Sequence, residues 1–334
     1  MKVGSVWLKR LRIGSLAIVG LLHGSFNSPA AAADFPDHSI SLVVPFAAGG
    51  PVDVIARAVA EGLSKELDGT VVVENKAGAG GAIAFGYVAR SKPDGYTLVA
   101  VDMSFAVLSH FNKDVGYDPV KDFRMIGQTS RSTLVLVVPG DSPTPNLESF
   151  IQHARKAGQG VSIANAGIGS TPHLAGLALA RVANIDPLMV PYRGMTPAVT
   201  DLLGGRIASA FVAPQSAVAL VAEGKLKMLA AIGEDRLKEA PGVPTFAEKG
   251  MDLPGFKRGT WYGLAAPAGT PAPVVEKLNA ALNRALDKPE LQKRLEPLGI
   301  FVHKTKPSEF DDFIRDQVSQ WNSIAATVKS VAKP

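Results

Sequence analysis

Short apolar segments rich in β-branched residues alternate with helical patterns from Ser39 onward. The first of these segments spans residues 40–45, and a turn of small residues follows it. Beyond that turn, apolar residues recur every fourth position, at Ile55, Val59, Leu63 and Leu67. This spacing places them on one face of a helix, which Gly69 ends. The β-α-β-α order predicts an α/β protein with mostly parallel sheets and helices on both faces.

The same alternation resumes after residue 119, with strands predicted at 134–138, 161–166, 188–192, 207–212 and 226–232. The C-terminal part differs, because it is helical apart from a short strand near residues 301–303. One sheet would need many strands, and a mature chain of about 300 residues is large enough for two lobes. We predict lobe I at 34–130 plus 263–334, lobe II at 131–262, and a ligand cleft between them.

The first 33 residues have the features of an export signal. Four cations precede an apolar run at 13–22, and three alanines at 31–33 form a small-residue cleavage site. The cations are Lys2, Lys9, Arg10 and Arg12. The run is too short to span a bilayer, for which about 20 apolar residues are needed. We therefore predict a signal peptide at 1–33 and a soluble mature protein; the alternative is a retained N-terminal anchor.

Charge and composition exclude several classes of function. The chain has a formal net charge of +5, and removing the four cations of the predicted signal leaves +1, so a nucleic-acid-binding surface is not expected. The absence of cysteine excludes disulfides, thiol nucleophiles and cysteine metal sites. No pair of histidines has metal-ligand spacing. Neither a dinucleotide-type nor a Walker-type glycine motif is present, so we predict no metal and no cofactor.

Two segments, 43–53 and 162–173, share a strand–turn–helix design that suits an anion. In each, an apolar strand ends in small residues that open a helix. Helix N-termini leave backbone N–H groups unpaired and carry partial positive charge, so they bind anions without Arg or Lys. Larger side chains than those of Ala48, Gly49 and Gly169 would keep a ligand away from this backbone. Parallel sheets place such turns at the carboxyl ends of their strands, and a carboxylate fits two turns that converge.

Other interpretations of the same residues remain open at this point. Gly-rich βα turns are common in α/β proteins, and one alone is weak evidence for a ligand. Asp53 is suited to capping its own helix, and so are Ser170 and Thr171 in the second segment. A hydrolase or lyase acting on a carboxylated substrate is the alternative from another class, because His173 follows Ser170 by three residues. The order at 167–170 is not that of a Gly-x-Ser-x-Gly nucleophile elbow, so we predict no catalysis.

Six segments carry a resemblance to a known family. They are PFAAGGPVD at 45–53, ENKAGAGG at 74–81, PDGYTL at 93–98, GSTPHL at 169–174, PYRG at 191–194 and DLLGG at 201–205. As a set they resemble the Bug-type receptors of tripartite tricarboxylate transporters, which are periplasmic binding proteins of the type II fold. The resemblance covers nearly all of the mature chain. Lys76-Ala77 stands where the family usually has Arg-Pro, which loosens that turn and leaves both ligand turns intact.

The resemblance implies a two-lobed periplasmic clamp, a monomer, that binds a small carboxylate such as a di- or tricarboxylate or an aromatic acid. It also implies delivery to a membrane permease of one large and one small subunit; a carboxylate sensor for a two-component system is the alternative role. Carried over by motif, the site would be lined by Phe46, Ala48, Gly49, Ser170 and Thr171. Asp53 and Asp201 would organise the helices around it. The predicted site is completed by Ser104, Gly169, His173, Tyr192 and Trp261. Trp261 has two open interpretations, stacking on a flat ligand or packing at the lobe interface.

Overall fold

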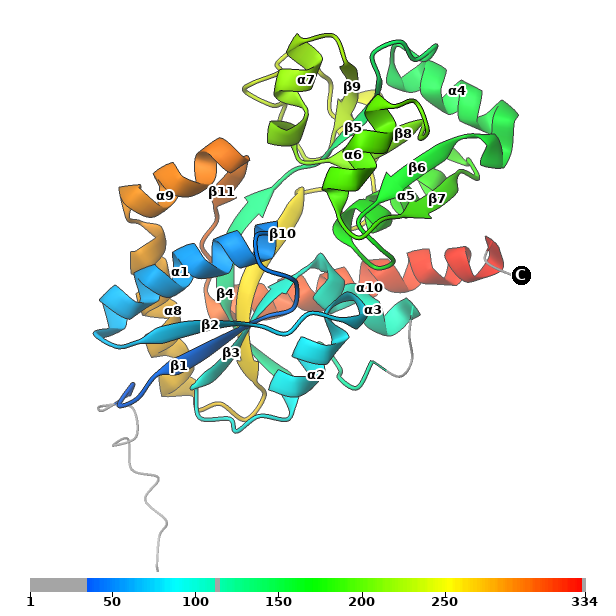
Figure 1. The fold of residues 1–334 in the computed structure, drawn as a ribbon. Helices are drawn as coiled ribbons and strands as arrows, with labels where there is room; N and C mark the ends of the chain where they lie inside the picture. Colours follow the sequence, from blue (N-terminus) through cyan, green and yellow to red (C-terminus); the bar gives the residue numbers. More distant parts are fainter. Residues whose placement is uncertain (1–34, 112–114, 332–334) are drawn as a thin grey trace, which may run out of the picture.

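The computed structural model describes residues 35–111 and 115–331, which form two lobes joined by two crossing segments (Figure 1). Lobe I is the part built on a six-stranded sheet, and lobe II is the part built on a five-stranded sheet. The predicted signal peptide at 1–33 lies outside the described residues. Within the described ranges, no helix is both long enough and apolar enough to cross a membrane.

Lobe I has the strand order β11-β4-β10-β3-β1-β2. Its strands are β1 (Ile40–Val44), β2 (Val71–Asn75), β3 (Thr97–Asp102), β4 (Phe123–Ser132), β10 (Thr260–Pro267) and β11 (Ile300–Val302). Its helices are α1 (Pro51–Leu67), α2 (Ala82–Ala89), α3 (Met103–Phe111), α8 (Ala272–Leu286), α9 (Pro289–Leu295) and α10 (Pro307–Val331), with short 3₁₀ turns η2 (Ala79–Gly81) and η6 (Glu296–Leu298). The C-terminal helices thus return to the lobe that the N-terminal strands begin.

Lobe II has the strand order β7-β6-β8-β5-β9. Its strands are β5 (Val135–Pro139), β6 (Ser162–Asn165), β7 (Leu188–Pro191), β8 (Ser209–Val212) and β9 (Leu226–Ala231). Its helices are α4 (Leu147–Ala157), α5 (Thr171–Ala183), α6 (Met195–Leu203) and α7 (Val218–Ala222), with 3₁₀ turns η3 (Gly158–Gly160), η4 (Pro214–Ser216) and η5 (Ala247–Lys249).

The predicted two-lobed α/β fold is confirmed, and both sheets are mixed. In lobe I, β1 pairs in parallel with β2 and β3, whereas β10 is antiparallel to both of its neighbours, β3 and β4. In lobe II, β6 pairs in parallel with β7 and β8, whereas β5 is antiparallel to β8 and β9. Most strands of each sheet therefore point the same way. Antiparallel ladders occur at β10 and β5, which enter from the other lobe, and also between β11 and β4 at the edge of lobe I.

The chain passes from one sheet to the other between Ser132 and Val135, and returns before Thr260. Ser132 and Thr260 are paired with each other in the sheet of lobe I. The predicted lobe ranges, 34–130 plus 263–334 and 131–262, remain predictions. The two crossing strands β4 and β10 lie side by side, so they are the natural hinge between the lobes.

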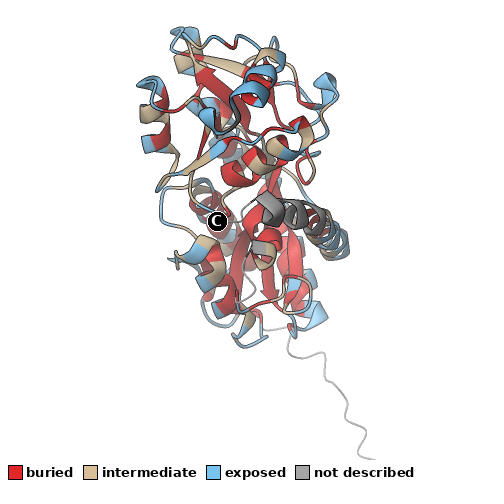
Figure 2. Ribbon diagram, turned by 90° about the vertical axis from the view of Figure 1, so that its right-hand side faces the viewer, coloured by how far each residue is buried: buried red, intermediate tan, exposed pale blue. Residues whose placement is uncertain are grey.

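The sheet of lobe I buries a separate apolar core on each face. Leu42 and Val44 pack against α1 and α8, whereas Val43 between them packs against α2 and α3, as expected from the two-residue period of a strand. The period of α1 is equally clear, because Ile55 and Val59 are buried on the same face. Figure 2 shows the buried residues concentrated along the strands of both lobes.

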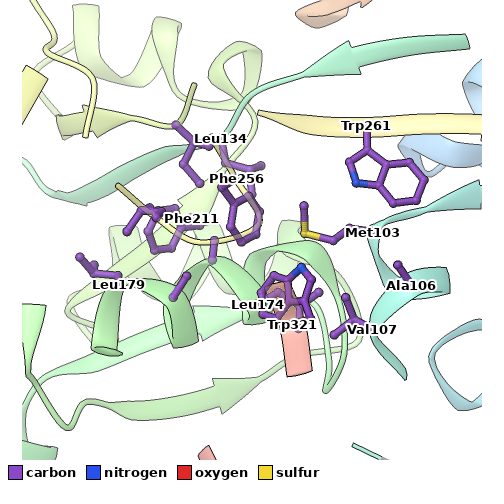
Figure 3. Packing of buried hydrophobic residues seen from close by; sticks show 14 of the residues in the cluster. Met103, Ala106, Val107, Leu134, Leu174, Leu179, Phe211, Phe256, Trp261 and Trp321 are labelled. Carbon is purple, nitrogen blue, oxygen red and sulfur yellow. The ribbon is translucent and has the colours of Figure 1, made fainter. Parts of the chain in front are cut away.

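The core on the α2–α3 face of lobe I continues into lobe II. Side chains from α3, α5, β8 and α10 belong to one buried cluster. Figure 3 shows Trp321 of α10 close to Leu174 of α5 and Val107 of α3. The two lobes are thus joined by buried apolar contacts along α10 as well as by the two crossing strands.

Candidate functional site

The first predicted turn connects β1 to the N-terminus of α1. Gly50 is the N-cap residue, Pro51 begins the helix, and Gly49 has a φ of +87°, a conformation that glycine adopts most readily. Ala48 and Gly49 are exposed, and Phe46 is half-buried against the apolar core under α1. The structure therefore presents the backbone of Ala48 and Gly49 to solvent, as the sequence predicts.

Asp53 holds this turn in place from the first turn of α1. Its carboxylate is 2% exposed and accepts hydrogen bonds from the Gly49 N–H at 2.9 Å, from Arg57 Nε at 3.0 Å and from Asn75 Nδ2 at 2.8 Å. Asn75 Nδ2 also donates to the carbonyl oxygen of Phe46 at 3.0 Å. Asp53, Arg57 and Asn75 thus tie the turn to α1 and to the end of β2.

The charge of Asp53 is stabilised by these donors. Burial raises the pKa of its carboxyl group, but the hydrogen bonds from Arg57, Gly49 and Asn75 outweigh burial, and the pKa is lowered overall. One consequence concerns the ligand: the Gly49 N–H is already used by Asp53. Among the hydrogen bonds of the described residues, none uses the N–H of Ala48. That group is therefore a better candidate donor than Gly49.

The second predicted turn connects β6 to α5 and repeats the design in lobe II. Gly167 and Gly169 have φ values of +111° and +82°. Ser170 is the N-cap residue of α5, where its Oγ accepts a hydrogen bond from the His173 N–H at 3.4 Å. Because an accepting hydroxyl keeps its own proton, Ser170 can cap the helix and still donate to an anion. In the described part of the chain, no hydrogen bond uses the N–H of Thr171, the first residue of α5.

His173 supports the second turn from inside the lobe. Its side chain is 9% exposed, and its Nδ1 accepts a hydrogen bond from the Gly169 N–H at 3.3 Å. Burial lowers the pKa of the imidazole to about 4, so the ring is neutral at neutral pH. The Oγ of Ser170 meets the backbone of His173. This geometry is a support for the turn and does not resemble a nucleophile activated by a base.

A third turn, at 78–81, lies between the two predicted turns. A methyl group placed on Gly81 would lie 3.2 Å from Cβ of Pro45, and one placed on Gly80 would lie 3.6 Å from the carbonyl oxygen of Ile168. Methyl groups on Gly80 and on Gly169 would each come within 3.0 Å of Cδ2 of Leu108 in α3. The 78–81 turn therefore lies against Pro45 of the first turn and Ile168 of the second, and Leu108 borders it on the side of the second turn.

Sequence reasoning missed these residues as part of the site. The glycine run at 78–81 was a visible signal, and three of its glycines have positive φ. Leu108 gave no signal, because an apolar residue of a helix is indistinguishable from ordinary core until the fold is known.

Tyr192 and Asp201 form a second carboxylate network, within lobe II. The hydroxyl of Tyr192 donates to Asp201 Oδ2 at 2.9 Å, and Arg206 Nη1 donates to Asp201 Oδ1 at 2.8 Å. The hydrogen bond from Arg206 and then that from Tyr192 lower the pKa of Asp201. The carbonyl oxygen of Tyr192 lies 3.7 Å from a methyl group placed on Gly167, so Tyr192 adjoins the second turn.

Ser104 and Trp261 are placed differently from the turn residues. Ser104 is fully buried and donates its N–H and hydroxyl to Asp102 Oδ1 at the end of β3. Burial raises the pKa of Asp102 to about 6. Trp261 is 2% exposed, donates from Nε1 to Gln317 Oε1 at 3.2 Å, and packs against Phe310 and Phe313 of α10. These contacts agree with the packing interpretation of Trp261.

The turns offer hydrogen-bond donors and helix N-termini, and no metal site accompanies them. Within residues 35–111 and 115–331, no group of three or more His, Asp or Glu side chains could hold a metal ion. Two helices of 17 and 13 residues begin at the turns, and their dipoles favour negative charge. Chemically, such an arrangement suits an anion.

Comparison with known proteins identifies the family. The family model described as tripartite tricarboxylate transporter family receptor matches residues 55–329. A UPF0065 protein from Pseudomonas sp. strain P51, in the tcbD-tcbE intergenic region, is 37% identical over 87% of this chain and 86% of its own length. Protein BugT of Bordetella pertussis is 31% identical over 92% of this chain and 95% of its own length.

Solved structures of relatives have the same fold. MatC from Rhodopseudomonas palustris, solved with bound malate, has a TM-score of 0.76 and 34% identity over 87% of this chain and 100% of its own. A second R. palustris protein, solved with adipate, has a TM-score of 0.76 and 28% identity over 88% of this chain and 98% of its own. The matched family is one of transporter receptors and not of enzymes. The chain belongs to the tripartite tricarboxylate transporter receptor family of periplasmic binding proteins.

Proposed function

We propose that this protein is a periplasmic receptor that binds a small organic dicarboxylate between the turn at 45–53 of lobe I and the turn at 167–173 of lobe II. The single observation that carries the proposal is that these two turns, each of which opens a helix, both lie against the 78–81 turn. Relatives 34% and 28% identical were solved with malate and adipate, both of which carry two carboxylates.

The acid group would be held by backbone donors and by Ser170. The N–H groups of Ala48 and Thr171 and the hydroxyl of Ser170 are the donors that the two turns offer. The other predicted residues would act around these donors. Phe46 would form an apolar wall, and Gly49 and Gly169 would allow the ligand to approach the backbone closely. The remaining residues would support the turns: Asp53, His173, Tyr192 and Asp201. Ser104 and Trp261 would not contact the ligand.

The proposed cellular role is capture of the acid in the periplasm and delivery to a membrane permease of one large and one small subunit. The signal-like features of residues 1–33 and membership of the transporter receptor family support this role. A ligand that contacts both lobes would bind the closed arrangement more tightly than an open one. It would therefore stabilise the closed arrangement. We propose that the lobes comprise 34–130 plus 263–334 and 131–262, and that the protein acts as a monomer.

A thermal-shift screen tests the ligand class. Malate, adipate, succinate and aromatic acids would be compared with glucose and arginine as non-carboxylate and cationic controls. A ligand present at about 100 times its dissociation constant stabilises the folded state by about 2.7 kcal/mol, which is a clear shift in Tm. Stabilisation by glucose or arginine and not by any acid would overturn the proposal. Turnover of a bound acid would instead support the hydrolase or lyase alternative.

A further inference from the structure

A cavity of about 350 Å³ lies at the hinge, away from the two turns. It is bounded by Arg131 near the end of β4, by the segment that leads into β10, and by one face of α10. The lining residues are Arg131, Gly255, Lys257, Arg258, Gly259, Trp261, Glu309, Asp312, Phe313, Asp316, Gln317 and Gln320. Both segments that connect the lobes therefore contribute to one cavity. We refer to it as the hinge cavity.

Two arginines give one end of the hinge cavity a positive charge. Among the described residues, neither Arg131 nor Arg258 has a carboxylate within 4.0 Å. Nε of Arg131 is buried and has no hydrogen-bond partner there, and its Nη2 makes only a long bond of 3.4 Å to Gln128. Burial and then the neighbouring Arg258 lower the pKa of Arg131, so the two guanidinium groups lie close enough to repel each other.

The wall formed by α10 has the opposite charge. Glu309, Asp312 and Asp316 lie on this wall. Among the described residues, none of these carboxylates forms an ion pair with Arg131 or Arg258, and the acid that raises the pKa of Arg131 is Glu234. Asp312 and Asp316 are exposed side chains, and Asp316 accepts a hydrogen bond from Gln320. The cavity thus has a cationic end and an acidic wall that are not paired with each other.

The shape of the hinge cavity is fixed by close backbone packing. Gly255 and Gly259 have φ values of +80° and +78°. A methyl group on Gly255 would lie 2.5 Å from Trp321 Nε1, and one on Gly259 would lie 2.5 Å from the carbonyl oxygen of Ser132. The rings of Trp261 and Phe313 meet edge to face, with centroids 5.4 Å apart, beside this backbone (Trp261 is labelled in Figure 3). These positions therefore leave no room for a side chain, and the backbone itself forms part of the wall.

We propose that the hinge cavity is a second binding site, for a small zwitterion with a carboxylate at one end and an ammonium group at the other. The carboxylate would pair with Arg131 and Arg258, and the ammonium group would face the carboxylates of α10. A simple anion would meet the acidic wall and a simple cation would meet the arginines, whereas a zwitterion complements both. The cavity is within the range of about 300–1,000 Å³ found for small-molecule sites.

Occupancy of this site would affect the hinge. A molecule that binds Arg131, Arg258 and α10 together would connect both crossing segments to the helix that packs on both lobes. Hinge motions are absorbed by a few residues at the ends of elements, and Arg131 and Gly259 are in such positions. The proposal does not depend on the nature of the ligand at the two turns.

Nuclear magnetic resonance of the Trp261 indole N–H tests the proposal, with the signal identified by Trp261→Phe. Three probes with the same four-carbon chain test the contribution of each charge: the zwitterion 4-aminobutyrate, the anion butyrate and the cation butylamine. We expect 4-aminobutyrate to shift the signal and to bind at least about tenfold more tightly than either singly charged probe. Arg258→Gln and Asp312→Asn, both at exposed positions, should each weaken it about tenfold. Arg124→Gln, which removes an exposed arginine from the same strand as Arg131, is the matched control and should leave the affinity unchanged.

Three results would overturn the proposal: a Trp261 signal that 4-aminobutyrate does not move, equal affinities for the three probes, or wild-type affinity in Arg258→Gln. Binding of butyrate at the turns is distinguishable, because Ser170→Ala should weaken it and leave the Trp261 response to 4-aminobutyrate intact. The experiments can therefore refute the hinge site and still support the proposed carboxylate site, or refute the carboxylate site and still support the hinge site.

Discussion

Replacement of Asp53 by alanine separates two roles for this carboxylate, support of the first turn and contact with the ligand. In the structure the side chain is 2% exposed and accepts hydrogen bonds from Gly49, Arg57 and Asn75. A hydrogen bond to a charged group contributes about 1.5–3 kcal/mol. The Arg57 side chain is 44% exposed, so water replaces part of what is lost. We therefore expect Asp53→Ala to lower the free energy of unfolding by about 3 kcal/mol in total.

Asp53→Asn should cost less, about 1–2 kcal/mol. Gly49 N–H and Arg57 Nε share Oδ2, and Asn75 Nδ2 donates to Oδ1. The amide keeps one acceptor oxygen, so it retains either the first two bonds or the third, and its NH₂ group cannot accept the rest. Urea denaturation measures both values. Asp235→Ala removes an exposed carboxylate that forms no ion pair in the described part of the chain, and as a control it should stay within about 0.5 kcal/mol of wild type.

Whether Asp53→Ala weakens or tightens ligand binding decides between the two roles of Asp53, support of the turn and contact with the ligand. If Asp53 supports the turn, removing it loosens the donors of lobe I and weakens binding of the carboxylate found in the screen. If Asp53 faced the ligand, its negative charge would repel the acid, and removal would tighten binding. Calorimetric titration of Asp53→Ala with that acid measures the sign. A loss of stability below about 1 kcal/mol together with tighter binding would refute the supporting role.

Three further predictions follow from the same contacts. Ser170→Ala should lose about 1–3 kcal/mol of affinity for the acid, and an unchanged dissociation constant in calorimetry would leave Ser170 as a helix cap only. Gly169→Ala should lower the free energy of unfolding in urea by about 1–2 kcal/mol, because its φ of +82° disfavours other residues and Leu108 lies 3.0 Å from the added methyl; wild-type stability would contradict the observed turn. Asp102 has a pKa raised to about 6 from 3.8 by burial, so its contribution is fully present below pH 3.8 and is lost as pH rises through 6. Relative to Asp102→Asn, the wild type should lose up to about 3 kcal/mol across that window in urea denaturation, and parallel pH profiles would refute the assignment.

The elements with a strong local pattern were predictable from the sequence. The apolar period of α1, the strand before it and the helix at 147–157 were each visible as local spacing. β4 was not, because this strand carries Gln128, Thr129 and Ser130, and these polar residues are buried in the centre of the sheet. The antiparallel insertion of β10 between β3 and β4 was also hidden, since it joins residues more than 100 positions apart and local spacing carries no information about it.

For the site, the sequence located the two turns but not the use of their donors. The glycines, the capping serine and the early aspartate all have local patterns with a physical meaning. Whether a given N–H is free depends on contacts between elements, such as the bond from Gly49 to Asp53. The same holds for the 78–81 turn and Leu108, which become part of the site only when two lobes come together.

The distribution of donors has a consequence for specificity. With the Gly49 N–H bound to Asp53 and the Gly169 N–H bound to His173, the glycines of the turns serve close approach and not hydrogen bonding. The donors left at the turns suit any carboxylate, so they set the class of ligand and not its identity. Discrimination between acids of different length must then come from the residues between the turns, which are small or apolar: Gly80, Leu108 and the exposed Ile168. In the proposed site, apolar surroundings of this kind would distinguish ligands by length and shape, at about 0.8 kcal/mol per buried methylene.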